Sequence, residues 1–360
     1  MLDPSDIKAS VAAGLITEAQ AANMAALAHS RKGARENLSP GDEPFELFKG
    51  FNEIFIVVGL GILATGWALV VGSIYVAEIN NPQQEAVYFG LLGAAILWGL
   101  SEYFVRRRRM VAPAIALSVL FAGNAALALT VYFAQPFMVA QDDFSSLPMP
   151  FALGTVALLI YWMRFRVPFT MAMIAVGLFI VAMLMAATTS GTPQDVSDLF
   201  LLSAGGPFAF ITLALGLAVF AVAMAFDMSD PHRVTRRSAN GFWLHVVAAP
   251  ALVNTMALTL LEQETQTANL ILLVILALFA LVAIVIDRRS FLIAAIGYIV
   301  AIAATVFDGA GAAWTILFLG MILLLLGAFW ERIRAFLLRL MPGFVPLHRL
   351  PPSSYVRTQK

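Results

Sequence analysis

Long apolar runs, interrupted at short intervals by polar joints, dominate the chain from residue 54 onward. A helix needs about 20 mainly apolar residues to cross a hydrocarbon core about 30 Å thick. Ten runs approach that length: 54–77, 86–104, 110–134, 148–163, 167–187, 207–226, 241–260, 268–286, 291–307 and 311–330. The pattern therefore predicts an all-α, polytopic transmembrane helical bundle with about ten spans.

The segment before the first span has a different pattern, typical of a small helical hairpin. Ile7, Val11 and Leu15 form one apolar face that ends near Gly14. Thr17 and Gln20 have the spacing of a capping box, which starts a second helix. We expect residues 1–33 to form a cytosolic hairpin that packs against a partner protein, a second copy of the chain or the cytoplasmic loops, because so short a segment buries little core alone. A solvated hairpin without a partner is the alternative.

Two amphipathic segments flank the ten-span domain, which we place at residues 53–330. Residues 34–52 read as a linker followed by an interfacial helix, and residues 192–206 as a short interfacial helix before the sixth span. In residues 331–360, Arg332, Arg334 and Arg339 flank apolar residues with helical spacing. We expect a cationic interfacial helix and a cytosolic tail there, with these three arginines bound to anionic lipid headgroups.

Composition supports a membrane protein. The 360 residues are 61% hydrophobic and 12% charged, with a mean hydropathy of +0.86, whereas soluble domains are about 25% charged. The absence of cysteine excludes disulfides, iron–sulfur clusters and a cysteine nucleophile. A formal net charge of zero argues against a nucleic-acid partner.

The distribution of charge predicts an orientation. All 22 Lys and Arg residues fall in the two termini and in every second connection. Because basic residues near spans stay in the cytoplasm, we expect a multi-pass protein with both termini cytoplasmic. The outer loops then hold nine acidic residues and no basic ones, which serves either loop solubility or the attraction of cations.

Motifs for chemistry are scarce. The four histidines are scattered over four regions, and neither a zinc-protease motif nor a phosphate-binding loop is present. Gly59, Gly61 and Gly66 lie inside an apolar span, where glycine permits close helix packing. We therefore expect no catalytic residue, no metal and no cofactor, and an intramembrane enzyme ranks third among the interpretations.

Ionisable groups in a bilayer are costly and are candidates for function. Glu102 lies one helical turn before Arg106, so an interfacial ion pair or a relay role fits it. His245 lies about four residues into the seventh span. It either bonds a neighbouring helix or titrates during transport.

Two amide side chains lie deeper in their predicted spans than Glu102 and His245 do. Asn124 in the third span and Asn254 in the seventh fall at similar depth, and Pro113 and Pro250 in the same spans free backbone carbonyls. The amides either join helices or line a substrate path. His245 and Asn254 are nine residues apart, so they face opposite sides of a straight helix.

The hairpin segment carries a resemblance. Ala13-Gly14-Leu15-Ile16-Thr17-Glu18-Ala19-Gln20-Ala21, followed by a linker and a train of spans, resembles bacterial predicted inner-membrane proteins of unknown function. The resemblance implies a similar layout in a bacterial inner (cytoplasmic) membrane, but no activity and no site residue.

Two functions remain open. The first is a small-solute transporter, because ten spans divide into two five-span halves that insert in opposite orientation. Its substrate-path candidates are Glu102, Asn124, His245 and Asn254, with Trp67 near the midplane. The second is a non-catalytic membrane scaffold or assembly protein of the cell envelope, which engages partners through the hairpin and the acidic loops.

Overall fold

The computed structural model describes residues 4–30, 51–77, 82–135, 138–141, 143–233, 235–288, 310–342 and 346–353. Within these ranges the chain forms helices and turns and has no β-strand. It divides into two compact units, which are described separately below. Unit 1 comprises Met1–Glu43 and Asp195–Lys360, and unit 2 comprises Pro44–Gln194.

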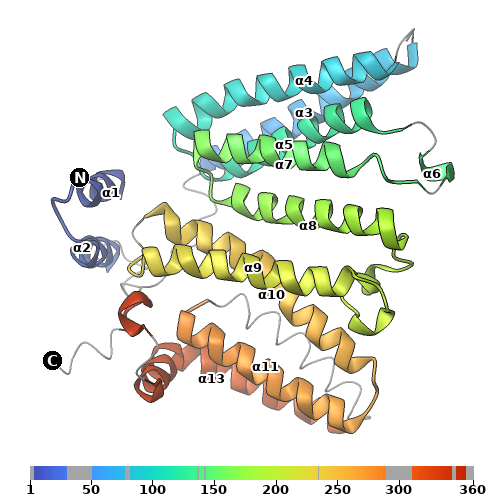
Figure 1. The fold of residues 1–360 in the computed structure, drawn as a ribbon. Coiled ribbons are helices and arrows are strands. Elements are labelled where there is room, and N and C mark those ends of the chain that lie inside the picture. Colours follow the sequence, from blue (N-terminus) through green and yellow to red (C-terminus); the bar gives the residue numbers. More distant parts are fainter. Residues whose placement is uncertain are drawn as a thin grey trace. The chain divides into compact units, whose positions relative to one another are not determined.

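Unit 2 is a bundle of apolar helices. Its described elements are α3 (Phe51–Ala77), α4 (Pro82–Ser101), the π-helix η1 (Glu102–Arg107), α5 (Ala112–Phe133), the short α6 (Met138–Gln141), α7 (Pro148–Phe165) and α8 (Phe169–Ser190). The helix α4 packs along α5, and α7 packs against both α5 and α8 (Figure 1). The order of packing thus largely follows the order of the chain, as short connections favour.

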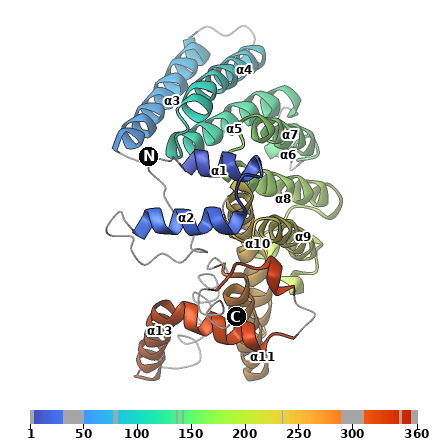
Figure 2. The same cartoon turned by 90° about the vertical axis from the view of Figure 1, so that its left-hand side faces the viewer.

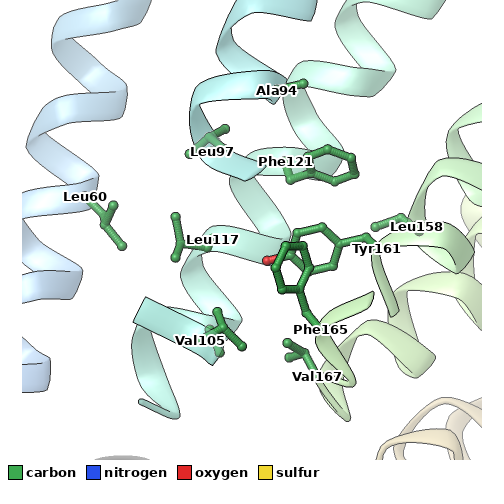
Figure 3. Close-up of a cluster of buried hydrophobic side chains, with 11 residues drawn as sticks. Leu60, Ala94, Leu97, Val105, Leu117, Phe121, Leu158, Tyr161, Phe165 and Val167 are labelled. Carbon is green, nitrogen blue, oxygen red and sulfur yellow. The ribbon is translucent and has the colours of Figure 1, made fainter. Parts of the chain in front are cut away.

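Aliphatic side chains and three aromatic ones, Phe121, Tyr161 and Phe165, form the core of unit 2 (Figure 3). The ring of Tyr161 stacks on Phe121 with 4.8 Å between centroids, and its hydroxyl lies 2.8 Å from the hydroxyl of Ser101. This bond satisfies a phenol that would otherwise be costly to bury. Tyr161 therefore joins α7 to α4 and α5 by both packing and hydrogen bonding.

Unit 1 contains the hairpin and the later helices. Its described elements are α1 (Pro4–Ala12), α2 (Glu18–Ser30), the 3-10 turns η2 (Val196–Leu199) and η3 (Leu202–Ala204), α9 (Phe208–Ser229), α10 (Arg236–Leu261), α11 (Gln266–Ile286), α13 (Ala310–Leu340) and the 3-10 turn η4 (Leu347–Arg349). The closest pair is α9 and α10; α11 packs on α10, and α13 packs on α11 (Figures 1 and 2).

Eight of the described helices are long and apolar enough to cross a membrane, and they coincide with the first eight predicted spans. These are α3, the segment from α4 through η1, α5, α7, α8, α9, α10 and α11. The ninth predicted span, 291–307, lies outside the described residues, and the tenth lies within α13. The described part of the chain is therefore compatible with a multi-pass membrane protein, and a total of ten spans stays a prediction.

The hairpin residues behave as their pattern predicts. The backbone N–H of Gln20 donates to Oγ1 of Thr17 at 3.2 Å, and the N–H of Thr17 donates to Oε1 of Gln20 at 2.9 Å. Gly14, after α1, has a left-handed φ of 71°, which glycine adopts without steric cost. The capping box and the break between the two helices are confirmed.

A helix does follow the tenth predicted span: α13 joins two helices across a kink at Phe329, and the second runs to Leu340. Its place at a lipid interface stays a prediction. Two local expectations need correction. Residues 192–206 form the two 3-10 turns η2 and η3 instead of one helix. Pro113 lies in the first turn of α5, where no intrahelical bond is lost. The interfacial segment expected before Phe51 lies outside the described residues.

Candidate functional site

Asp227 lies at the centre of the most extensive polar contact network in the described residues of unit 1. It sits in the last turns of α9, with 5% of its surface exposed. Its Oδ2 lies 2.9 Å from Nε2 of His245, and it also accepts from Nε of Arg288 at 2.9 Å. Its Oδ1 accepts from Nη2 of Arg288 at 2.5 Å. One carboxylate thus joins α9 to α10 and to the residues that follow α11.

The backbone of α10 is shaped to admit this carboxylate. Gly241 faces it, and a Cβ at that position would overlap Oδ1 of Asp227. One turn earlier, the carbonyl oxygen of Ser238 accepts from Nη2 of Arg288 at 3.0 Å. Arg288 therefore bridges two helices, and a glycine on the second helix leaves room for the bridge.

A second buried ion pair involves Asp287, the residue that directly precedes Arg288 in the sequence. Asp287 ends α11 in the left-handed conformation, with φ of 58°. Its Oδ2 lies 3.0 Å from Nη1 of Arg233, and its Oδ1 accepts from Nε1 of Trp330 at 2.8 Å. Arg233 also donates from Nη2 to the carbonyl oxygen of Asp287 at 2.6 Å. This pair ties the connection between α9 and α10 to the end of α11 and to α13.

Asp230 completes the arrangement by ordering the start of α10. Its Oδ2 accepts from the backbone N–H of Thr235 at 2.8 Å and from the Thr235 hydroxyl at 2.7 Å. Thr235 in turn accepts from the N–H of Arg237 at 3.2 Å and so caps α10. We call Asp227, Asp230, Arg233, His245, Asp287 and Arg288 the ionic cluster. The end of unit 1 that holds it is called the basic end.

Burial governs the electrostatics of the ionic cluster. Arg288 is 1% exposed, and removal from water lowers its pKa to about 9. The guanidinium is still charged at neutral pH and neutralises Asp227. His245 is fully buried, and its ring packs edge-on against Phe220 at 5.4 Å. Charges held this way are stable only as a set, because loss of one partner strands the other in a low-dielectric site.

His245 is the one predicted site residue that belongs to the ionic cluster. The expectation that it bonds a neighbouring helix is confirmed by its contact with Asp227 on α9. Asn254 lies nine residues further along α10 and is half-buried. A role of either residue in a substrate path stays a prediction.

Asn124 lies in unit 2, where it is tightly packed. Its Nδ2 donates to the carbonyl oxygen of Leu120 at 2.9 Å. A Cβ added to Gly93 would overlap its Oδ1 and would lie 3.1 Å from Nε1 of Trp67. Three helices thus approach closely around Gly93, which favours the interpretation of Asn124 as a packing residue. Because Asn254 belongs to unit 1, a meeting of the two amides stays a prediction.

An apolar groove of about 460 Å³ opens elsewhere in unit 2, between α4, α5 and α7. Its wall is entirely apolar and includes Trp98, Phe121 and Ile160. Neither Asn124 nor Trp67 lines it. The groove suits a hydrocarbon chain and offers nothing to hold a polar solute.

Glu102 forms the predicted ion pair with Arg106, with 2.9 Å between Oε2 and Nη1. Its other oxygen lies 2.7 Å from Nε of Arg164 on α7. Glu102 begins the π-helix η1, a geometry that often marks functional positions. All three side chains are partly exposed, so the pairs contribute little stability.

The arginines expected at the lipid interface differ in burial. Arg332 and Arg339 are partly or fully exposed on α13. Arg334 is fully buried, and its Nη2 donates to the carbonyl oxygen of Pro351 at 2.5 Å. It therefore anchors the C-terminal segment to α13 instead of facing lipid, whereas lipid binding by the other two stays a prediction.

The sequence analysis does not single out Asp227 or Arg288. Asp227 falls one residue beyond the predicted end of the sixth span at residue 226, and Arg288 is one of the 22 basic residues that indicate the orientation. A signal did exist: Asp227 and His245 lie near the adjoining ends of consecutive spans, so antiparallel packing brings them to similar depth. The distant Arg288 carries no comparable local signal.

Among the residues that the structure describes, no three His, Cys, Asp or Glu side chains group to hold a metal ion. The ionic cluster offers hydrogen bonding, charge and one imidazole, and this chemistry suits the binding of ions or protons. The chain matches no protein-family model, no curated protein and no solved structure.

Proposed function

We propose that this membrane protein is transporter-like and moves a small solute, with the ionic cluster as its gate at the basic end. The carrying observation is Asp227, a buried carboxylate bonded to both His245 and Arg288. Ionisable groups at membrane depth are expensive and mark ion pathways and relays in transport proteins. Stability alone does not call for such a group, because well-packed apolar side chains commonly serve as well.

A gate needs a closed and an open arrangement of its helices, and the contacts of the ionic cluster can hold the closed one. It joins α9, α10, α11 and α13 through few strong contacts, so these helices separate only when several ion pairs exchange partners. Beyond the cluster, α10 continues into an apolar core around Ala249, Val253 and Leu276. A closed cluster thus seals a dry interior from the basic end.

The natural lack of cysteine makes the gate directly testable. Ala248 lies one turn deeper than His245, about 4.5 Å along the helix, and is fully buried. Ala248→Cys should react slowly with a hydrophilic maleimide in the intact protein. Adding Arg288→Gln should open the gate and speed labelling at least about tenfold.

Ala257→Cys is the matched control, because Ala257 is equally buried on α10 but lies in the apolar core. Its labelling should stay slow in both backgrounds. Equal acceleration at both positions would mean general unfolding, and no acceleration at Ala248→Cys would contradict the gate. Uptake of a panel of labelled amino acids, sugars and carboxylates into proteoliposomes, with Asp227→Asn as the inactive comparison, tests transport itself.

We also propose the orientation that the charges indicate: a bacterial inner membrane with both termini in the cytoplasm. The resemblance of the hairpin to bacterial inner-membrane proteins supports the membrane, and the one-sided distribution of Lys and Arg supports the orientation. A C-terminal fluorescent-protein fusion should then be bright and a C-terminal alkaline-phosphatase fusion inactive. A dark fluorescent-protein fusion together with an active phosphatase fusion would overturn this orientation.

A specific observation favours the second function, a membrane scaffold. Leu15 and Leu27 of the hairpin are 77% and 61% exposed, an unusual position for large apolar side chains on so small an element. Deleting residues 1–33, or combining Leu15→Ser with Leu27→Ser, should release co-purifying protein. The exposed Ala12→Ser serves as a control, and an unchanged set of co-purified proteins would count against a scaffold.

A further inference from the structure

The apolar groove of unit 2 combines exposed edges with a buried floor. Of the residues that line it, Leu91, Val156 and Ile160 have 57%, 50% and 48% of their surface exposed, whereas the small residues Ala94 and Ala125 are buried. On membrane-spanning helices, an open apolar groove meets the hydrocarbon of the bilayer. Atoms that border an unfilled space lose their dispersion contacts, so a flexible apolar chain stabilises the groove by filling it.

The length of the groove is closer to one leaflet than to a whole bilayer. On α4 it runs from Leu91 to Trp98, and on α7 from Leu153 to Ile160. Seven residues of helix rise about 10 Å. One leaflet of hydrocarbon is about 15 Å thick, half of a core of about 30 Å. A spanning helix of a second copy would need a groove along its full length, so the dimensions favour an acyl chain.

The groove ends near a group of arginines. Trp98 and Ile160 are each followed about one helical turn later by a charged residue, Glu102 and Arg164, and these two form an ion pair. We call this end of unit 2 the arginine end. Its described residues include six exposed arginines: Arg106, Arg107, Arg108, Arg109, Arg164 and Arg166. Two acids lie there among the described residues, Glu102 and Glu53, and Glu53 bonds to the backbone of α5. Positive charge therefore exceeds negative charge at this end.

Arg106 and Arg164 have donors left for a phosphate group. Both pair with Glu102, Arg106 through Nη1 and Arg164 through Nε. Their other N–H groups donate to no residue that the structure describes, and the two side chains are 46% and 45% exposed. Guanidinium groups bind phosphate oxygens through paired N–H groups, and long arginine side chains near span ends reach the headgroup layer. Two guanidiniums that share one carboxylate thus complement a further negative charge.

We propose that the groove and the arginine end together bind one anionic phospholipid of the surrounding membrane. One acyl chain lies in the groove beside Trp98, and the headgroup phosphate accepts from Arg106 and Arg164. Charge complementarity selects the lipid: a zwitterionic headgroup brings its own cation, whereas an anionic one carries a negative charge that only the protein compensates. Basic pockets between spanning helices bind anionic headgroups for the same reason. Lipid binding here does not depend on the proposed transport function.

Trp98 lines the groove and can report what occupies it. The full-length protein is reconstituted into phosphatidylcholine vesicles that contain a minor fraction of phosphatidylglycerol, with bromine on the acyl chains of either the one lipid or the other. Bromine quenches tryptophan fluorescence only at short range, and Trp98→Phe identifies the contribution of Trp98 among the six tryptophans. Phosphatidylglycerol should bind beside Trp98 at least about fivefold more tightly than phosphatidylcholine, the effect of about one arginine near a charged headgroup.

Two double variants test the charge. Arg106→Gln combined with Arg164→Gln should abolish the preference for phosphatidylglycerol. Arg332→Gln combined with Arg339→Gln is the matched control, because it removes two exposed arginines from α13, and it should leave the preference unchanged. Equal affinity for the two lipids in wild type, or a preference that persists without Arg106 and Arg164, would overturn the anionic site.

A further variant tests the groove without changing charge. Ala95 lines the groove and is exposed, so Ala95→Leu should narrow it and reduce the quenching of Trp98 by both brominated lipids. Quenching as strong as in wild type would mean that the bound chain lies elsewhere. If neither lipid quenches Trp98 in wild type, no acyl chain enters the groove and the proposal is wrong.

Discussion

At the scale of single residues, Asp227 shows how a charge is kept inside an apolar helix pair. Arg288 supplies two donors, His245 supplies a third contact, and Gly241 leaves the space that the carboxylate occupies. Each contact depends on the others, because a carboxylate without donors or a guanidinium without an acceptor is costly at this depth. The residues should therefore behave as a unit under mutation.

The first prediction concerns that unit. Asp227→Asn and Arg288→Gln should each lower the free energy of unfolding by about 3–5 kcal/mol, because each strands a buried charge. The double variant should lose less free energy of unfolding than the two single variants lose together, as expected for residues in direct contact. Unfolding titrations with sodium dodecyl sulfate measure the cycle.

The exposed pair Arg106–Glu102 is the control for this cycle. Arg106→Gln should leave the free energy of unfolding almost unchanged, because water screens this exposed pair. Strict additivity at Asp227 and Arg288 would contradict the ion pair as the dominant contact.

A second prediction at this scale concerns the space beside Gly241 that the Asp227 carboxylate occupies. Gly241→Ala should destabilise the protein by about 1–3 kcal/mol, because the new methyl group overlaps Asp227 and lies 3.2 Å from the carbonyl oxygen of Ala223. Gly123→Ala on α5 meets no neighbouring atom within 4 Å and should be neutral or stabilising. Thermal unfolding in detergent compares the two, and similar melting temperatures would exclude the overlap.

At the scale of helices, most of the fold follows from apolar length and polar joints. Eight predicted spans match described helices because a bilayer leaves few alternatives to a helix of that length. The helix ends were predicted less well. The structure starts α10 at Arg236, five residues before the predicted start at residue 241, because the Asp230–Thr235 cap acts across a connection that a hydropathy pattern does not describe.

Contacts between distant helices were beyond a reading of the sequence. Glu53 on α3 is 4% exposed, and its carboxylate accepts from the backbone N–H groups of Val111 and Ala112 at the start of α5. In the sequence Glu53 is only a charge at the edge of the first span. Its role arises from helix packing that separates donor and acceptor by 58 residues.

A third prediction tests that cap. Glu53→Ala should cost about 1 kcal/mol of stability, because the first amides of α5 lose their acceptor and the positive helix end loses a negative charge. Glu53→Gln keeps an acceptor oxygen without the charge, so it should cost less. Thermal unfolding of unit 2, followed by fluorescence of a probe attached to α5, ranks the variants, and an equal loss for both would assign the effect to charge alone.

At the scale of the molecule, electrostatic interactions connect the hairpin to the end of unit 1 that holds the ionic cluster. Burial raises the pKa of Glu18, the first residue of α2, and repulsion from Asp230 raises it further, while Arg237 acts in the opposite direction. A carboxyl group with a raised pKa binds more protons in the docked state than when it is free in solvent. Acidification therefore favours docking of the hairpin, and docking weakens as the pH rises through the raised pKa.

The last prediction follows from this direction of the pH dependence of docking. Spin labels on Ala12→Cys and Ser229→Cys, two exposed positions in a chain without native cysteine, should report a narrow distance distribution at pH 5 and a broader one at pH 8. Glu18→Gln cannot ionise, so the hairpin should stay docked at both values. If the distribution in wild type does not change with pH, Glu18 does not control docking; if Glu18→Gln still responds, another group such as His232 carries the effect. Because Asp230 belongs to the ionic cluster and acts on Glu18, a hairpin that follows pH in this way would act at the same end of unit 1 at which we propose the gate.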